Sequence, residues 1–221
     1  MLVALWAHAP DGLDGEGEAR LLLRKFLWRA FLTDRYELAT NGRIFADYRL
    51  LAPRLKGQDA GVPLIFNDER HPLPTAEDLL LAGWPKKRER LARAILLISL
   101  RQGGLDFADG SQATRDSLRS REYHHIFPID LLEDAGEEQG KVYRALNCAL
   151  VTWKTNRNIS AKSPIEYLQK RIDASTLGEA EIRRRLVSHS IDYDVLVAGN
   201  YDEFLAARAE TLLPEVQRLG S

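Results

Sequence analysis

Residues 120–132 have the sequence SREYHHIFPIDLL, which contains two of the five histidines of the chain, His124 and His125. The aromatic and β-branched residues around the pair favour a strand. Pro128 ends the run, because proline has no N–H to donate to a sheet. The stretch therefore predicts a short strand that carries two adjacent imidazoles.

A second strand-forming run, CALVTW, lies at residues 148–153. Between the two runs, residues 129–147 predict a loop with a helical turn. After the second run, Ser163 and Glu166 have the spacing of a capping box, with a proline at the first helical position, and they predict a helix start. The centre of the chain is thus expected to be strand, loop, strand and helix.

Apolar residues recur at helical spacing on both sides of this centre. We expect a helical region at 1–103, in which Thr75 caps one helix, and C-terminal helices at 173–221 that pack on a core at 104–172. Within the core, residues 105–110 predict a short strand and a turn. The predicted class is α+β, mainly α.

Composition limits the function classes. A net charge of −1 over 221 residues gives no sign of a nucleic-acid partner, so any such surface must come from local clustering. The single cysteine excludes an internal disulfide and a multi-cysteine zinc site. No apolar run approaches the length of a membrane span. We expect a soluble, cytoplasmic protein with no membrane partner.

Two asparagines complete a constellation with the histidines. Asn147 lies 22 positions after His125, and Asn156 lies nine positions further, near the start of the expected helix. A ββα unit can bring the end of its first strand beside the first turn of its helix, so we expect His124, His125 and Asn156 to converge. Neighbouring strand residues point to opposite faces, and the convergence therefore needs the strand to end or twist sharply there.

The pattern HHIFP, then Asn147, then TNRNISAKSP resembles the HNH, or ββα-metal (His-Me finger), nuclease motif. It is especially similar to the C-terminal nuclease domain of GmrSD-type modification-dependent restriction enzymes. The resemblance implies a ββα-metal core embedded in a helical domain. It implies that His124 and Asn156 bind one divalent metal ion, that His125 is the general base, and that Asn147 holds the loop between the strands by side-chain hydrogen bonds.

The implied reaction is metal-dependent hydrolysis of DNA phosphodiester bonds, as part of restriction or anti-phage defence. A histidine that titrates near neutral pH suits the base, and an ion with few protein ligands keeps positions open for phosphate oxygens. Mg²⁺ or Mn²⁺ is the expected cofactor, with Ni²⁺ and Co²⁺ as alternatives. Because His124 offers nitrogen, we expect Mn²⁺ or Ni²⁺ to support activity at least as well as Mg²⁺.

Basic residues next to the motif are expected to hold DNA phosphates: Arg121, Lys154, Arg157 and Lys162. Glu122 is either a hydrogen-bond partner of a histidine or an exposed carboxylate at the strand end. The basic runs at 86–90 and 183–185 are expected to be solvated helix faces.

GmrSD-type proteins are much longer, with an N-terminal region associated with nucleotide use and the sensing of modified DNA. The chain contains no GxxxxGK[ST] loop, so we expect it to be a C-terminal fragment or a stand-alone truncation without that region. Dimerisation stays open. The alternative function is a catalytically inactive module of the HNH fold that binds DNA or another protein.

Overall fold

The computed structural model describes residues 1–85, 89–174 and 176–221. This part of the chain is mainly helical with a small antiparallel sheet, which confirms the predicted α+β, mainly α class. The strands are β1 (Arg121–His125) and β2 (Cys148–Thr152). The α-helices are α1 (Leu2–Trp6), α2 (Leu13–Leu32), α3 (Thr40–Leu55), α4 (Ala76–Leu81), α5 (Arg90–Arg101), α6 (Ile129–Asp134), α7 (Gln139–Val142), α8 (Trp153–Ile159), α9 (Pro164–Ala174), α10 (Gly178–Val187), α11 (Tyr193–Ala198) and α12 (Tyr201–Gly220). Short 3₁₀ turns are η1 (Asp34–Tyr36), η2 (Leu64–Phe66), η3 (Leu118–Ser120) and η4 (Ala145–Asn147).

The chain divides into two compact units. Unit 1 comprises residues 1–74 and 215–221, and unit 2 comprises residues 75–214. The predicted boundaries near residues 103 and 172 both fall inside unit 2. Among the described helices, none combines the length and the apolar character that a membrane crossing requires.

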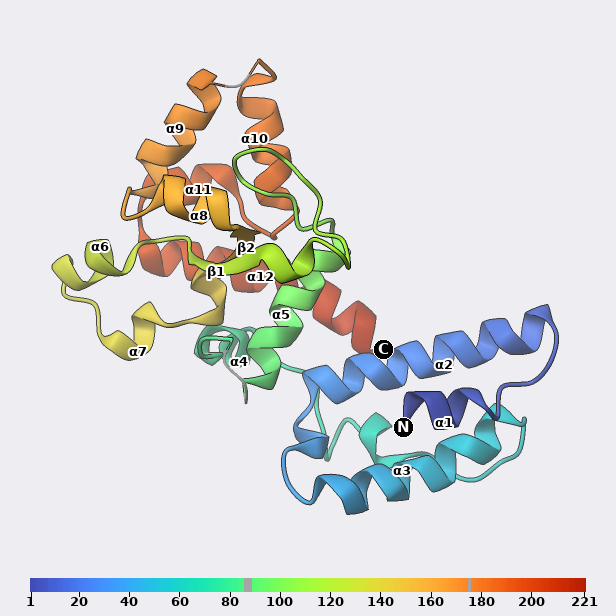
Figure 1. Ribbon diagram of the computed structural model, residues 1–221. Helices are drawn as coiled ribbons and strands as arrows, with labels where there is room; N and C mark the ends of the chain where they lie inside the picture. The colour runs from blue at the N-terminus through green and yellow to red at the C-terminus, as the bar shows by residue number, and fades with distance from the viewer. Residues whose placement is uncertain (86–88, 175) are drawn as a thin grey trace. The chain divides into compact units, whose positions relative to one another are not determined.

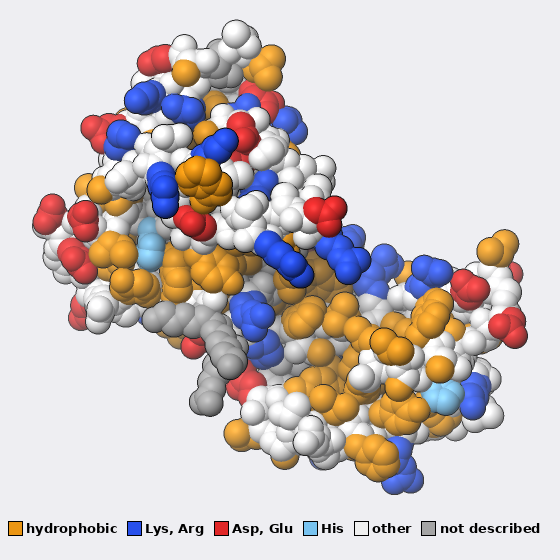
Figure 2. Space-filling view, in the orientation of Figure 1, with side chains coloured by type: hydrophobic (Ala, Val, Ile, Leu, Met, Phe, Trp, Pro, Cys, Tyr) orange, Lys and Arg blue, Asp and Glu red, His pale blue; other side chains and the backbone are white. Residues whose placement is uncertain are grey.

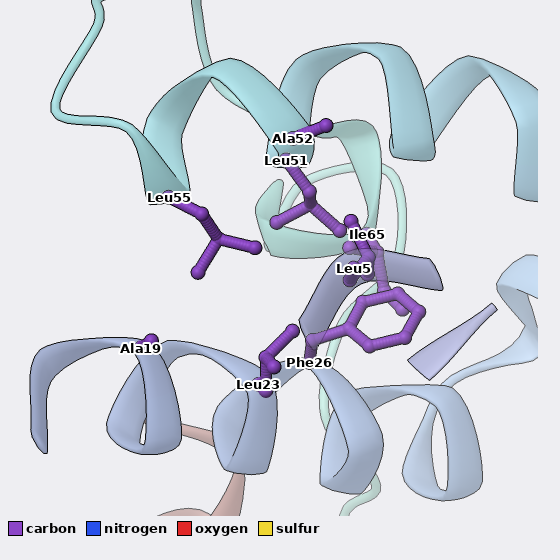
Figure 3. Packing of buried hydrophobic residues seen from close by; sticks show 8 residues of the cluster. All are labelled: Leu5, Ala19, Leu23, Phe26, Leu51, Ala52, Leu55 and Ile65. Atoms are coloured by element: carbon purple, nitrogen blue, oxygen red, sulfur yellow. The ribbon is translucent and has the colours of Figure 1, made fainter. Parts of the chain in front are cut away.

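Unit 1 is built around an apolar core between α1, α2 and α3. On α2, Ala19, Leu23 and Phe26 recur at helical spacing and are buried. Figure 3 shows these side chains facing Leu51 and Leu55, which project from α3. Apolar side chains at helical spacing thus form the contact between α2 and α3.

Unit 2 contains the hairpin of β1 and β2. The strands pair antiparallel, with Arg121 opposite Thr152 and His125 opposite Cys148. On one face, Cys148 and Leu150 pack against α5. Helix α8 follows β2 directly and contacts both strands (Figure 1). The predicted order of strand, loop, strand and helix is therefore present.

Two segments of unit 2 differ from the expectation. Residues 105–110 form a turn without a strand, because the Asp106 carboxylate accepts hydrogen bonds from the backbone N–H groups of Ala108 and Asp109. The expected loop at 129–147 contains more helix than one turn, namely α6, α7 and η4. The two predicted strands are thus joined by a structured connection.

The predicted helix starts are confirmed. Thr75 and Asp78 form a capping box at α4, and Ser163 and Glu166 form the same reciprocal bonds at α9. The run at 183–185 is only partly solvated, because Arg185 is buried and donates to the carbonyl oxygens of residues 107 and 108. The first part of the other basic run, residues 86–88, lies outside the described residues.

Candidate functional site

A chain of hydrogen bonds joins the end of β1 to the first turns of α8. His124 Nδ1 lies 2.9 Å from Asn156 Oδ1. The other end of the Asn156 amide, Nδ2, donates to Glu122 Oε2 over 2.8 Å. Three side chains from two elements thereby meet at one place, and Glu122 reaches the histidine through Asn156 and not directly.

These bonds fix the protonation of His124. A carboxylate accepts and does not donate, so the amide N–H of Asn156 faces Glu122 and its oxygen faces the ring. The ring therefore carries its proton on Nδ1, and the Nε2 lone pair is the free one. Nε2 is buried, with no hydrogen-bond partner among the described residues. Burial lowers the pKa of His124 to about 4, against the opposing effect of the Asn156 bond, so the ring is neutral at pH 7.

His125 has a separate environment. Its ring stacks on Trp84, with centroids 3.7 Å apart and an interplanar angle of 10°, and meets the Tyr143 ring edge-on at 5.2 Å. The Trp84 segment is held there because the Ala145 N–H donates to the carbonyl oxygen of Ala82. Burial, and then the nearby His124, lower the pKa of His125 to about 4.

The expected convergence of three side chains is therefore only partial. His124 and Asn156 meet, but His125 lies on the opposite face of β1. The cause is the pleat of the strand, which remains regular through His125 in its pairing with Cys148. Phe107 and Tyr167 contact the ring of His124, while the ring of His125 contacts a different set of aromatics.

Asn147 lies where a loop-holding residue is expected. It is fully buried, and its Oδ1 accepts from the Phe127 N–H over 2.8 Å. Its Nδ2 donates to the carbonyl oxygens of Phe127 and Val142 at 3.1 and 3.2 Å. The amide thus ties the exit of β1 to the end of α7.

Asp106 is a buried residue that the sequence did not single out. Its carboxylate accepts from the Thr152 N–H at 2.6 Å and from the Thr155 hydroxyl at 2.5 Å. Burial by itself raises the pKa of Asp106, but these and two backbone hydrogen bonds outweigh it and lower the pKa. The carboxylate fixes the junction of β2 and α8, immediately before Asn156.

Two buried arginines brace the hairpin through carbonyl groups. Arg208 of α12 donates to the carbonyl oxygens of Leu146, Cys148 and His189. Arg121 donates to those of residues 104, 111 and 150. The expectation that Arg121 contacts DNA is therefore corrected, since its guanidinium is buried and engaged with the backbone.

The other predicted phosphate contacts are on α8 and just after it. Lys154 and Arg157 are exposed and flank the ring of Trp153, which is 43% exposed, with their charged groups 5.8 and 5.1 Å from its centroid. Lys162 is half-buried and donates to the carbonyl oxygen of Asn158. These three cations remain available to an anionic partner.

His124 Nδ1 and Asn156 Oδ1 are hydrogen-bonded to each other at 2.9 Å. Two ligands about 2.1 Å from one octahedral ion, at a right angle, are about 3.0 Å apart, so these two atoms could hold an ion only after Nδ1 loses its proton and the ring changes tautomer. The Glu122 carboxylate lies at the other end of the Asn156 amide, where it accepts from Nδ2. No cluster of three or more His, Cys, Asp or Glu side chains suited to a metal occurs in the described ranges, so an ion here depends on the Asn156 oxygen.

No family model, curated protein or solved structure matches the chain. Sequence reasoning missed Trp84, Asp106 and Tyr167 as neighbours of the histidines. Tyr167 carried a usable signal, because Pro164, Tyr167 and Leu168 are buried on one face of α9 at helical spacing. Trp84 carried none, because its contact with His125 joins distant parts of the sequence.

Proposed function

We propose that unit 2 is an HNH-type endonuclease that hydrolyses DNA phosphodiester bonds with one divalent metal ion. The observation that carries the proposal is the Glu122–Asn156–His124 hydrogen-bond chain at the junction of a β-hairpin and the following helix. The buried amide of Asn147 supports it, since it holds the loop between the two strands.

The side chains have distinct parts in this proposal. His124 and Asn156 hold the metal ion, and Glu122 orients the Asn156 amide. A bound ion would act as a Lewis acid on the phosphate and the departing oxygen. Lys154 and Arg157 hold backbone phosphates. His125 is the proposed base: a pKa of about 4 leaves it unprotonated at neutral pH, but also makes it a weaker base than the near-neutral histidine that the role favours.

The base role of His125 demands a rearrangement. Its ring is stacked on Trp84 on the face of β1 opposite to His124, and its Nε2 is buried without a partner among the described residues. To accept a proton from water at the phosphate, the ring must leave Trp84. This position favours a second candidate, an HNH-fold module that binds DNA without cutting it.

Cleavage of plasmid DNA separates the two candidates. The assay compares Mg²⁺, Mn²⁺, Co²⁺ and Ni²⁺, with EDTA as the control, and measures DNA binding in parallel. The endonuclease proposal expects cutting with Mn²⁺ or Ni²⁺ at least as fast as with Mg²⁺. DNA binding without cutting in any metal would establish the non-cleaving module instead.

Variants test the residues. His125→Ala should slow cleavage by about 10²–10⁴-fold, the usual contribution of a general base, and Asn156→Ala should abolish the metal response. Asn41→Ala is the matched control, because Asn41 is an exposed asparagine of unit 1, and it should cut at the wild-type rate. If His125→Ala cuts as fast as the wild type, His125 is not the base.

A further inference from the structure

A small pocket between α8 and α9 has a mostly apolar lining that includes three cationic side chains. Lys162, Lys170 and Arg171 line it, together with Phe107, Ala108, Asn158, Ile159 and Tyr167, and its lining contains no acidic residue. Lys and Arg side chains gather over α8 and α9 in Figure 2. The electrostatic character of the pocket therefore favours an anion.

These cations differ from others in unit 2. Arg183, Arg184 and Arg185 form ion pairs with carboxylates. Lys170 and Arg171 form none with any residue that the structure describes. Lys162 uses one N–H on the carbonyl oxygen of Asn158 and keeps two for a ligand. The positive charge of Lys170 and Arg171 is thus not neutralised by an ion pair within the described part of the chain.

Tyr167 supplies the second, independent observation. Its side chain lines the pocket and is only 3% exposed, and its hydroxyl has no hydrogen-bond partner within the described residues. A buried polar group without a partner calls for an explanation, such as a ligand. Burial raises the pKa of Tyr167, so the hydroxyl keeps its proton and is a donor.

The neighbourhood of the pocket connects it to the site already described. Phe107 and Tyr167 form its aromatic side, and both rings contact the ring of His124, with centroids 6.4 and 6.3 Å away. An anion in the pocket would therefore be separated from the His124–Asn156 pair by a single aromatic ring.

We propose that this pocket binds a phosphate group, with Lys162, Lys170 and Arg171 supplying positive charge and the Tyr167 hydroxyl donating a hydrogen bond. The inference deepens the proposed function, on which it rests for the identity of the natural ligand, a phosphate beside the one that is cut. The phosphate chemistry is the same for a nucleic-acid backbone and for free phosphate.

Binding measured in EDTA tests the pocket without any cleavage. Inorganic phosphate is titrated by calorimetry into the full chain and into two variants, Tyr167→Phe and the double variant Lys170→Ala/Arg171→Ala. Lys56→Ala is the control, because Lys56 is an exposed lysine of unit 1. We expect a tenfold or larger rise in the Kd for phosphate in the double variant, a rise of about fivefold in Tyr167→Phe, and no change in Lys56→Ala.

Thermal unfolding without phosphate checks that the hydroxyl has no structural partner. Tyr167→Phe should then be at least as stable as the wild type. Wild-type protein that binds no phosphate, or variants that bind it with unchanged affinity, would overturn the proposal. So would a lower Tm for Tyr167→Phe in the absence of phosphate.

A single-stranded oligonucleotide distinguishes the sources of the phosphate. If the backbone is the ligand, the oligonucleotide displaces inorganic phosphate, and an uncharged methylphosphonate oligonucleotide does not. If free phosphate is the ligand, neither displaces it, and the pocket is still a phosphate site. A chain that binds phosphate in EDTA but never cuts DNA would keep this inference and refute the endonuclease proposal.

Discussion

Replacing Asn147 by alanine should destabilise unit 2 strongly. The change removes three hydrogen bonds. It leaves the buried Phe127 N–H and the carbonyl oxygens of Phe127 and Val142 without the partner that Asn147 supplied. Each buried polar group left unpaired costs about 1–3 kcal/mol, and such losses are not additive. We therefore expect a loss of about 4 kcal/mol in the free energy of unfolding.

Urea denaturation followed by circular dichroism measures this loss. With a typical m-value of about 2 kcal/mol per molar urea, the midpoint should fall by about 2 M. Asn158→Ala is the matched control in the same unit, because Asn158 is exposed on α8, and it should stay within about 0.5 kcal/mol of the wild type. If Asn147→Ala unfolds within 1 kcal/mol of the wild type, the loop is not held by these bonds.

Asn147→Asp sharpens the test. The carboxylate can still accept from the Phe127 N–H, but it cannot donate to the two carbonyl oxygens and places a charge beside them. We expect it to be at least as destabilising as alanine at pH 7. Because protonation is favoured in the folded state, its deficit relative to the wild type at the same pH should shrink as the pH falls. A deficit that is constant between pH 7 and 4 would contradict this explanation.

Two further predictions concern other buried groups. Burial lowers the pKa values of His124, His125 and His189 to about 4, so the unfolded chain binds protons that the folded chain does not, and stability should fall as the pH drops from about 6.5 to 4. The slope of stability against pH should approach about 4 kcal/mol per pH unit for three protons. It should be somewhat smaller because His125 is only partly buried. Urea midpoints that do not change over this range would contradict the prediction. Arg208→Met should lower the free energy of unfolding by about 3 kcal/mol, measured by urea denaturation, because it leaves the carbonyl oxygens that Arg208 binds unpaired. Arg208→Lys should lower it less. Equal urea midpoints for Arg208→Met and the wild type would show that these hydrogen bonds are not needed.

Local sequence signals predicted the two strands and the helix starts of unit 2. The cap at Thr75 and the capping box of Ser163 and Glu166 are present where their spacing indicated. The first strand ends at His125, and the next two residues bond to Asn147. The Ile126 N–H donates to the Asn147 carbonyl oxygen, and the Phe127 N–H donates to Asn147 Oδ1. Such features depend on residues a few positions apart, which a sequence displays directly.

The orientation of the histidines depends on distant contacts. Alternation along β1 separates His124 from His125, but nothing in the local pattern shows that Trp84 covers one face and that α8 covers the other. The burial of Arg121 and Arg208 has no signal in the sequence, because charged residues are usually at the surface. Their partners are backbone carbonyl groups, which every residue carries and which therefore leave no signal in the sequence.

The bonds of Arg208 set an order of events during synthesis. Arg208 binds the carbonyl oxygen of Cys148 at the start of β2, and it is 60 residues further along the chain than Cys148. At translation rates of about 5–20 residues per second, the hairpin leaves the ribosome about 3–12 s before its brace. A nascent chain paused within this interval should carry a hairpin without the hydrogen bonds of Arg208. A chaperone or protease would have access to it.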